Sequence, residues 1–176
     1  VLTEDSPAGK DFLAEVCAQW EAASKAIEAM GVRRVVIRTG HFFSRAGGLL
    51  PWAALPFRFF AGGPLGGGKQ WWAWIHARDA VRAVRFLIEN ENARGIFNLG
   101  APNPATNAEF ARTLGRVLQR PAFVPAPAFA FKLLLGEMAG LTILAGQRAI
   151  PKRLREAGFK FEFEKLEEAL RDMFKH

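Results

Sequence analysis

The chain has 176 residues, of which half are hydrophobic and 23% are charged, and its formal net charge at pH 7 is +7. This composition is that of a globular protein and excludes a disordered one, and the length suits one domain, or one domain with a small appendage. No apolar run reaches the roughly 18 residues of a membrane span. The single cysteine, Cys17, excludes a disulfide framework and a multi-cysteine metal site.

The N-terminus is acidic and polar and lacks the pattern of a signal peptide. Together with the lone cysteine, this predicts a cytoplasmic protein that has no membrane partner. The basic excess suggests an acidic partner, such as a phosphorylated small molecule, a nucleic acid or an anionic surface. The basic residues are spread along the chain, however, so most of them are better explained as solvated surface charge, and a nucleic-acid partner is disfavoured.

The first element predicted along the chain is a helix. Apolar residues recur at intervals of three and four over residues 12–30, which predicts a helix that Gly31 ends. We expect Trp20 on this helix to be buried against a sheet and Cys17 to be an inert thiol in the core. Residues 49–60 are apolar but contain two prolines, which predicts short irregular helices there.

A strand of the buried parallel type is predicted over residues 34–38, because the run is rich in β-branched residues. It ends at Thr39-Gly40, small residues that suit a loop facing a ligand. Arg38 at the end of a buried strand should pair with a carboxylate or with a ligand phosphate, because an unpaired buried charge is very costly.

Residues 62–79 (GGPLGGGKQWWAWIHARD) are the most informative stretch. The order predicts a glycine loop, a strand over residues 71–75 and a helix over residues 80–90 with Asp79 as its N-cap. Two interpretations stay open: glycines and tryptophans that receive a planar or sugar-like ligand, or a hairpin whose tryptophans fill the core. A phosphate loop is excluded, because Gln70 replaces the Ser or Thr that ligates Mg²⁺ and a strand follows the motif.

Predicted helices and strands also alternate in the second half of the chain. Thr106 and Glu109 form the pattern of a capping box at the start of a helix that runs to about Leu118. The other predicted elements are a buried strand over residues 96–99, an edge strand over residues 123–125, helices over residues 129–144 and 151–157, a strand over residues 159–163 and a final helix over residues 166–174. Alternating strands and helices make this an α/β protein. Only two strands are of the buried parallel type and the G-x-G-x-x-G fingerprint is absent, which suggests the latter portion of a larger domain.

Seven sequence segments, taken in their order along the chain, match those of a known protein family. They are TEDSP (3–7), RVVIRTG (34–40), LPFR (55–58), GGPLGGGKQWWAWIHARD (62–79), NLGAPNPATNAEFA (98–111), GQRAIPKRLREAGF (146–159) and LEEALRDM (166–173). The sequence resembles the atypical epimerase family of the extended short-chain dehydrogenase/reductases, whose members end in a small domain of unknown function. The resemblance covers essentially the whole chain.

This resemblance implies the C-terminal part of an NAD(P)-binding Rossmann-like fold over residues 1–100 and a small α/β domain over residues 101–176. The N-terminal half of such a protein is missing, so we expect a fragment that functions with that half or as a homodimer. NADP or NAD would bind to the full-length parent and not tightly to this chain alone. Extended members also use a Tyr-x-x-x-Lys pair, whereas this sequence has no tyrosine. The catalytic residues are therefore unknown, and no metal site is expected.

The resemblance also implies site residues. Backbone groups of Gly40, His41 and Phe42 would contact the nicotinamide, although His41 fits a solvent-exposed loop about equally well. The substrate cleft would take in Lys69, Gln70, Trp72, Trp74 and His76. Lys69 and Gln70 are equally well explained as turn residues, and His76 is better explained by a structural hydrogen bond than by proton transfer.

The favoured hypothesis is the C-terminal portion of an epimerase- or oxidoreductase-like protein that acts on a nucleoside-diphosphate sugar, inactive alone. The alternative is a non-catalytic module that binds single-stranded nucleic acid or a protein. For nucleic acid the tryptophans would stack on bases, which requires that Trp71, Trp72 and Trp74 be exposed beside a basic groove.

Overall fold

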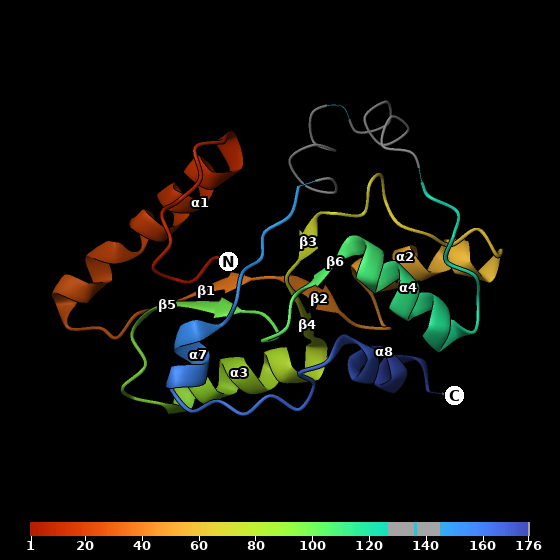
Figure 1. Cartoon of the computed structure of the whole chain (residues 1–176). Helices are drawn as coiled ribbons and strands as arrows, with labels where there is room; N and C mark the ends of the chain where they lie inside the picture. Colours follow the sequence, from red (N-terminus) through yellow and green to blue (C-terminus); the bar gives the residue numbers. More distant parts are fainter. Residues whose placement is uncertain (127–135, 137–144, 176) are drawn as a thin grey trace.

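The computed structural model describes residues 1–126, 136 and 145–175. Its elements alternate between helix and strand, as the sequence predicts, and Figure 1 shows their arrangement. In chain order they are α1 (Phe12–Ala23), η1 (Lys25–Met30), β1 (Val35–Thr39), β2 (His41–Phe43), α2 (Leu49–Arg58), β3 (Trp71–Trp72), β4 (Trp74–His76), α3 (Ala77–Glu89), β5 (Gly95–Leu99), β6 (Ala105–Thr106), α4 (Asn107–Leu118), α7 (Lys152–Glu156) and α8 (Leu166–Phe174). Within the described ranges, no helix has the length and apolar character that a membrane crossing needs.

The two strands predicted to be of the parallel type pair with each other. β1 and β5 are parallel, with Val35 opposite Gly95 and Thr39 opposite Leu99. Below them in Figure 1, α3 and α7 cover one face. One of the two core clusters lies here and takes its buried residues from β4, α3, β5, α7 and the connecting segments: Ile75, Ala80, Ala83, Leu87, Ala93, Phe97, Leu99, Leu154 and Phe159. This packing is the α/β arrangement that the sequence predicts.

A second cluster lies where β2, β4, α2, α4 and α8 meet. β2 runs parallel to β4, and β3 runs antiparallel to β6. The largest side chains in this cluster are Phe43, Phe57, Trp72, Trp74, Phe110 and Phe163. The capping box of α4 is confirmed: the Thr106 side chain accepts from the Glu109 N–H and the Glu109 carboxylate accepts from the Thr106 N–H.

The first helix differs from its prediction. α1 is shorter than expected, a separate 3₁₀ segment follows it, and none of its residues is buried. Gly31 does end the segment, in the left-handed conformation with φ of 76°. Trp20 is 77% exposed and Cys17 is exposed, so the expected burial of both is wrong. The helical spacing marks an apolar face, but the described part of this chain does not cover it.

Ionic contacts attach the end of α1 to β1. Arg38 Nε and Nη2 donate to the two carboxylate oxygens of Glu21 at 2.6 and 2.8 Å. Arg34 donates to the Glu21 carbonyl and to Ser24 Oγ. The expectation that Arg38 has a carboxylate partner is confirmed, and the guanidinium holds the pKa of Glu21 below its usual range.

Five other expectations about local structure are corrected. The segment 71–75 is two short strands in different sheets, with β3 paired to β6 and β4 paired to β2. Residues 49–58 form one helix despite Pro56. Residues 123–125 and 159–163 are not strands. The helix predicted over 80–90 begins at Ala77, with His76 and not Asp79 as its N-cap. The helix predicted over 129–144 falls outside the described residues, apart from residue 136.

Candidate functional site

The residues predicted to contact a nicotinamide lie at the carboxyl ends of the parallel strands. Gly40 separates β1 from β2, and its N–H donates to Leu99 O at 3.0 Å. The His41 N–H donates to Ala73 O at 2.6 Å. A Cβ at position 40 would lie 2.4 Å from that oxygen, so only glycine fits here. Gly40, His41 and Phe42 therefore lie at the sheet edge where open α/β folds bind their ligands.

The side chains of His41, Phe42 and Phe43 differ in their accessibility to solvent. Phe43 is buried in the core, whereas Phe42 is partly exposed. The His41 ring lies 5.0 Å from the Trp72 ring, centroid to centroid, and burial lowers the pKa of His41. Burial therefore favours the neutral form of this ring. Phe42 is the one of the three whose ring an incoming ligand can reach directly.

The glycine loop packs closely on the rest of the chain. A Cβ on Gly63 would lie 2.0 Å from Val124 O, and a Cβ on Gly68 would lie 2.8 Å from the Ala108 side chain. Gly68 also has a positive φ of 66°. Close packing and backbone conformation thus account for these two glycines without a ligand.

Polar contacts fix the same loop to the start of α4. Gln70 Nε2 donates to Leu65 O at 3.0 Å. The Leu65 N–H donates to Asn107 Oδ1 at 2.7 Å, and the Asn107 N–H donates to Gln70 O at 2.9 Å. The Gln70 side chain is used within the loop, whereas Lys69 is exposed and carries its charge at the surface.

Two of the three tryptophans belong to the core. Trp72 and Trp74 are buried, and Trp74 Nε1 donates to Asn103 O at 3.0 Å. Trp71 is half-buried, and the Arg148 guanidinium lies 4.4 Å above its ring centre. A surface on which bases stack needs exposed rings. The observed burial therefore argues against the nucleic-acid alternative and favours the interpretation in which tryptophans fill the core.

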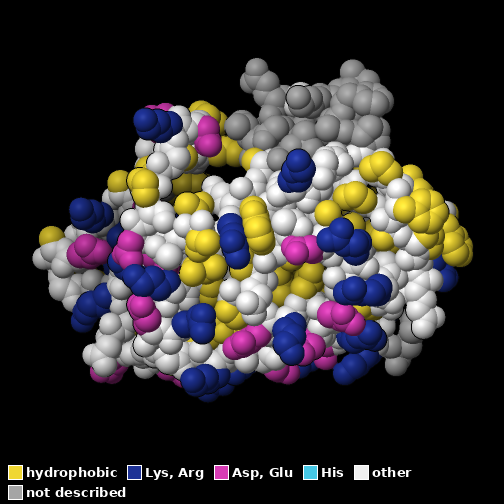
Figure 2. Space-filling model, viewed as in Figure 1, with side chains coloured by type: hydrophobic (Ala, Val, Ile, Leu, Met, Phe, Trp, Pro, Cys, Tyr) yellow, Lys and Arg dark blue, Asp and Glu magenta, His cyan; other side chains and the backbone are white. Residues whose placement is uncertain are grey.

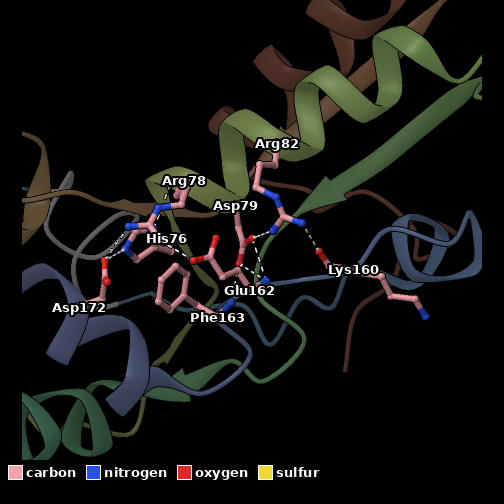
Figure 3. A network of polar contacts seen from close by, with 8 residues as sticks. All are labelled: His76, Arg78, Asp79, Arg82, Lys160, Glu162, Phe163 and Asp172. Carbon is pink, nitrogen blue, oxygen red and sulfur yellow. Dashed lines mark hydrogen bonds and ion pairs between the residues drawn. The ribbon is translucent and has the colours of Figure 1, made fainter.

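His76 joins α3 to α8 in a network of polar contacts (Figure 3). Its Nδ1 accepts the Arg78 N–H at 3.0 Å, so the proton of the neutral ring is assigned to Nε2. Nε2 lies 3.3 Å from Asp172 Oδ2, and the ring stacks on Phe163 with centroids 4.0 Å apart. Burial lowers the pKa of His76, while the Asp172 carboxylate opposes that shift. The expected structural hydrogen bond is present at Nδ1, and the Asp172 carboxylate beside Nε2 is a neighbour that the sequence did not indicate.

Asp79 is the centre of the same network, and its side chain is fully buried. Oδ1 accepts from Arg82 Nη1 at 2.6 Å and from the Glu162 N–H at 2.9 Å. Oδ2 accepts from the Phe163 N–H at 2.8 Å (Figure 3). This carboxylate thus replaces the strand pairing that residues 159–163 lack, and it anchors the C-terminal segment to α3.

Sequence reasoning missed several of these polar groups because their partners are remote. Asn107, Glu162 and Asp172 are ordinary helix or loop residues in the sequence. Glu4 is also buried, and its Oε1 accepts from the Asn98 and Arg153 N–H groups at 3.0 and 3.3 Å. The TEDSP motif signalled this position only through the resemblance.

The lowered pKa of His76 predicts a dependence of stability on pH. In the unfolded chain the ring titrates near pH 6.5, whereas the folded chain resists protonation. The unfolded state therefore binds more protons below that pH. The stabilisation is complete above about pH 6.5 and is lost as the pH falls towards the folded pKa, by at most about 1.4 kcal/mol per pH unit.

Urea unfolding between pH 7 and 5.5 measures this slope. Asparagine at position 76 keeps an acceptor for the Arg78 N–H but does not titrate, so His76→Asn is expected to flatten the profile. Burial also lowers the pKa of His41, so His41→Asn serves as the matched control and isolates the share of each ring. An unchanged slope in His76→Asn would contradict the assignment.

The parallel strands, the helices on their face and the glycine-interrupted strand end form part of a Rossmann-like α/β fold. The sequence matches the NAD dependent epimerase/dehydratase family over residues 14–100. It also matches a domain of unknown function, DUF1731, over residues 126–173. The chain is therefore similar to the epimerase family over residues 14–100, and its C-terminal match is the domain of unknown function that the resemblance implied.

Relatives and solved structures agree with this assignment. The chain is 44% identical over 172 residues to the chloroplastic epimerase family protein SDR39U1 homolog of Arabidopsis thaliana, covering 97% of this chain and 49% of the relative. The human epimerase family protein SDR39U1 (isoform 2), solved with NADPH, has a TM-score of 0.93 at 37% identity and matches 98% of this chain and 58% of its own.

A nucleoside-diphosphate sugar epimerase from Corynebacterium glutamicum is also similar, with a TM-score of 0.76 at 32% identity, over 98% of this chain and 33% of its own. The chain thus spans about half the length of the Arabidopsis relative and a smaller share of the bacterial epimerase.

Proposed function

We propose that this chain is the C-terminal portion of an NAD(P)-dependent epimerase- or oxidoreductase-like protein that acts on a nucleoside-diphosphate sugar. The observation that supports this most strongly is its likeness, over nearly its whole length, to the NADPH-bound human protein. The relative from Corynebacterium glutamicum, named for its nucleoside-diphosphate sugar, supports the substrate class. We place the boundary between the Rossmann-like part and the small C-terminal domain near residue 100.

Only part of a dinucleotide site fits the residues of this chain. Gly40 and His41 use their N–H groups on Leu99 and Ala73, which leaves the Phe42 ring and backbone carbonyls to contact a nicotinamide. The G-x-G-x-x-G loop that holds a pyrophosphate is absent from this sequence. When bound, NADP or NAD would supply hydride transfer. The residues here would orient its nicotinamide end, and the phosphates would bind to the N-terminal half of the parent.

The substrate cleft is proposed along the segment from Lys69 to His76. Lys69 is exposed and suits a diphosphate. Trp72, Trp74 and His76 lie behind it in the interior, so their contribution would be to hold the segment rigid. Without a tyrosine, no residue of this chain matches the proton-transferring pair of ordinary members, and we propose that the chain alone is inactive.

We also propose that a partner covers α1 and the free edge of β1. Among the described residues β1 pairs only with β5, and Phe12, Trp20 and Met30 face solvent. Open strand edges and exposed apolar faces favour association. The partner would be the N-terminal half of the parent or a second copy of this chain.

Calorimetry with NADPH tests the proposed division of the site. The chain alone is expected to show no binding at concentrations up to about 1 mM, which corresponds to less than about 4 kcal/mol of binding free energy. A chimera that carries the N-terminal half of the Arabidopsis relative in front of Val1 is expected to bind one NADPH. Tight stoichiometric binding by the chain alone would contradict the division, and so would no binding by a folded chimera.

The same chimera tests the substrate class. Lys69→Ala is expected to weaken binding of a nucleoside-diphosphate sugar about tenfold, the loss of one charge-assisted hydrogen bond. Lys160→Ala removes another exposed lysine and serves as the control. If Lys69→Ala binds as tightly as the control, the position of the cleft is wrong.

A further inference from the structure

A group of exposed large apolar side chains, which the site above does not use, lies on α2 and on the segments beside its C-terminal end. Trp52 and Phe59 are each 74% exposed, and Leu55 lies between them on the same stripe of the helix. Phe60 follows directly, and Phe123 is 76% exposed. We call these five residues the α2 patch. Figure 2 shows apolar side chains gathered at the end of the molecule where α2 lies.

The parts of the α2 patch are adjacent in space. The Val124 N–H donates to Gly62 O at 3.1 Å, which places the segment with Phe123 beside the one that follows Phe60. The Arg120 guanidinium lies 4.7 Å above the Phe60 ring centre. The opposite face of α2, with Leu50, Ala54 and Phe57, is buried in the core. The patch therefore lies on two adjoining segments, and its helix is anchored in the core.

Phe60 occupies a position that normally requires glycine. It follows the C-cap Phe59 and has a left-handed φ of 58°. Glycine is the usual residue there because a side chain is strained in this conformation. The side chain gains little burial in return, since Phe60 is among the exposed large hydrophobic residues. Neither backbone preference nor packing accounts for this aromatic ring, which is what a binding role would explain.

The two segments that carry the α2 patch hold charges of one sign. The sequence has no Asp or Glu from residue 29 to residue 78, nor from residue 110 to residue 126. Arg58 and Arg120 border the patch, and neither forms an ion pair within the described part of the chain. A second copy would bring like charges together in a two-fold contact. An occupant with acidic groups is favoured instead.

The residue types favour a protein over a lipid surface. Trp, Phe and Arg are enriched in the energetic centres of protein interfaces. Basic contacts to anionic lipids instead use clusters of about four to eight Lys or Arg, whereas two arginines border this patch. A guanidinium held over an aromatic ring is also oriented to bind a carboxylate in a bidentate way. We propose that the α2 patch docks a partner protein through a segment that combines apolar and acidic side chains, independently of the epimerase site.

Defined peptides test this docking surface. Three labelled amphipathic peptides of about 16 residues share one Leu/Trp face and differ on the polar face, which carries Glu, Gln or Lys. Fluorescence anisotropy with the 176-residue chain is expected to show the Glu peptide binding at least about tenfold more tightly than the Gln peptide, with the Lys peptide weakest. Equal binding of the three, or binding of none, would overturn the proposal.

Variants locate the binding surface. Trp52→Ala with Phe59→Ala is expected to weaken the Glu peptide by at least about tenfold. Val81→Ala with Ile88→Ala removes exposed apolar side chains from α3 and should leave binding within about twofold. Phe60→Gly should weaken binding while the melting temperature stays equal or rises, which separates docking from folding. Binding that survives all the patch variants would overturn the assignment.

Two further measurements test whether the patch binds a lipid surface or a second copy of the chain instead of a partner protein. Co-sedimentation with vesicles of phosphatidylcholine and phosphatidylserine would reveal a lipid surface, and light scattering would reveal a second copy. If Trp52→Ala with Phe59→Ala abolishes vesicle binding or self-association, the patch serves that occupant and the proposal fails. Unchanged results in both measurements support it.

Discussion

Replacing Asp79 by alanine is expected to lower the free energy of unfolding by about 3–5 kcal/mol, the cost of removing one partner from a buried charged network. The carboxylate is fully buried and accepts hydrogen bonds from the Glu162 and Phe163 N–H groups and from Arg82. Without it, two backbone donors lose their partner and the C-terminal segment loses its anchor on α3. For a chain of this size the melting temperature should fall by about 10 °C.

Urea unfolding followed by circular dichroism measures this loss. Glu89→Ala removes a carboxylate from the exposed i,i+4 pair with Arg85 on the same helix, and surface substitutions of this kind usually change stability by less than about 0.5 kcal/mol. Asp79→Asn keeps one acceptor oxygen but replaces the other with an NH₂ group, which cannot accept the backbone N–H that it faces. The loss of unfolding free energy in this variant should therefore be intermediate. A melting temperature for Asp79→Ala equal to that of Glu89→Ala would contradict the anchoring role.

Asp79 also illustrates what sequence alone could predict. The motif correctly indicated a helix start with an acidic residue near it, because both the N-cap and the first turn favour acids. Local rules could not decide whether Asp79 is the N-cap or a residue of the first turn. Taking it as the N-cap placed the predicted helix start at residue 80, three residues after the observed start at Ala77. The two backbone groups that donate to Asp79 belong to Glu162 and Phe163, more than 80 residues away, and no local pattern predicts these contacts.

The glycine loop shows the same limit at the candidate site. Glycine permits close approach of any neighbour, whether a ligand or the backbone of the chain itself. At Gly63 that neighbour is Val124, and at Gly40 it is Ala73. The paired strands β1 and β5 were predictable, because a β-branched run fits only a narrow set of environments. The glycines were not, because their partners come from remote segments.

The periodicity of the first helix was detected correctly, but its consequence depended on residues elsewhere. The apolar stripe predicts that a face must be covered. In the described structure Phe12, Trp20 and Met30 are exposed, and β1 beside them pairs on one edge. A pattern in the sequence can therefore indicate burial without indicating which chain provides it. The exposure of Trp20 is the clearest case, because a tryptophan face is costly to leave in water.

Association through this surface is the second large effect that we expect. Light scattering at low micromolar concentration should give a mass above the 19.4 kDa of one chain, either as a homodimer or, when the N-terminal half of the parent is supplied, as a complex with it. Exposed side chains tolerate charge without loss of folding, so Trp20→Glu with Met30→Glu should return the chain to a monomer with unchanged circular dichroism. Buried charge at an interface costs several kcal/mol, which is enough to dissociate a micromolar complex.

The control for this experiment lies on another exposed face. Val81→Glu places the same charge on α3, away from α1 and the free edge of β1, and should leave the mass unchanged. If the double variant dissociates and Val81→Glu does not, the contact lies on α1. A folded monomer of 19.4 kDa in the unmodified chain, which also fails to bind the supplied N-terminal half, would contradict the proposal. It would mean that α1 and β1 are stable in water as they stand, with the Glu21–Arg38 pair as a principal link between them.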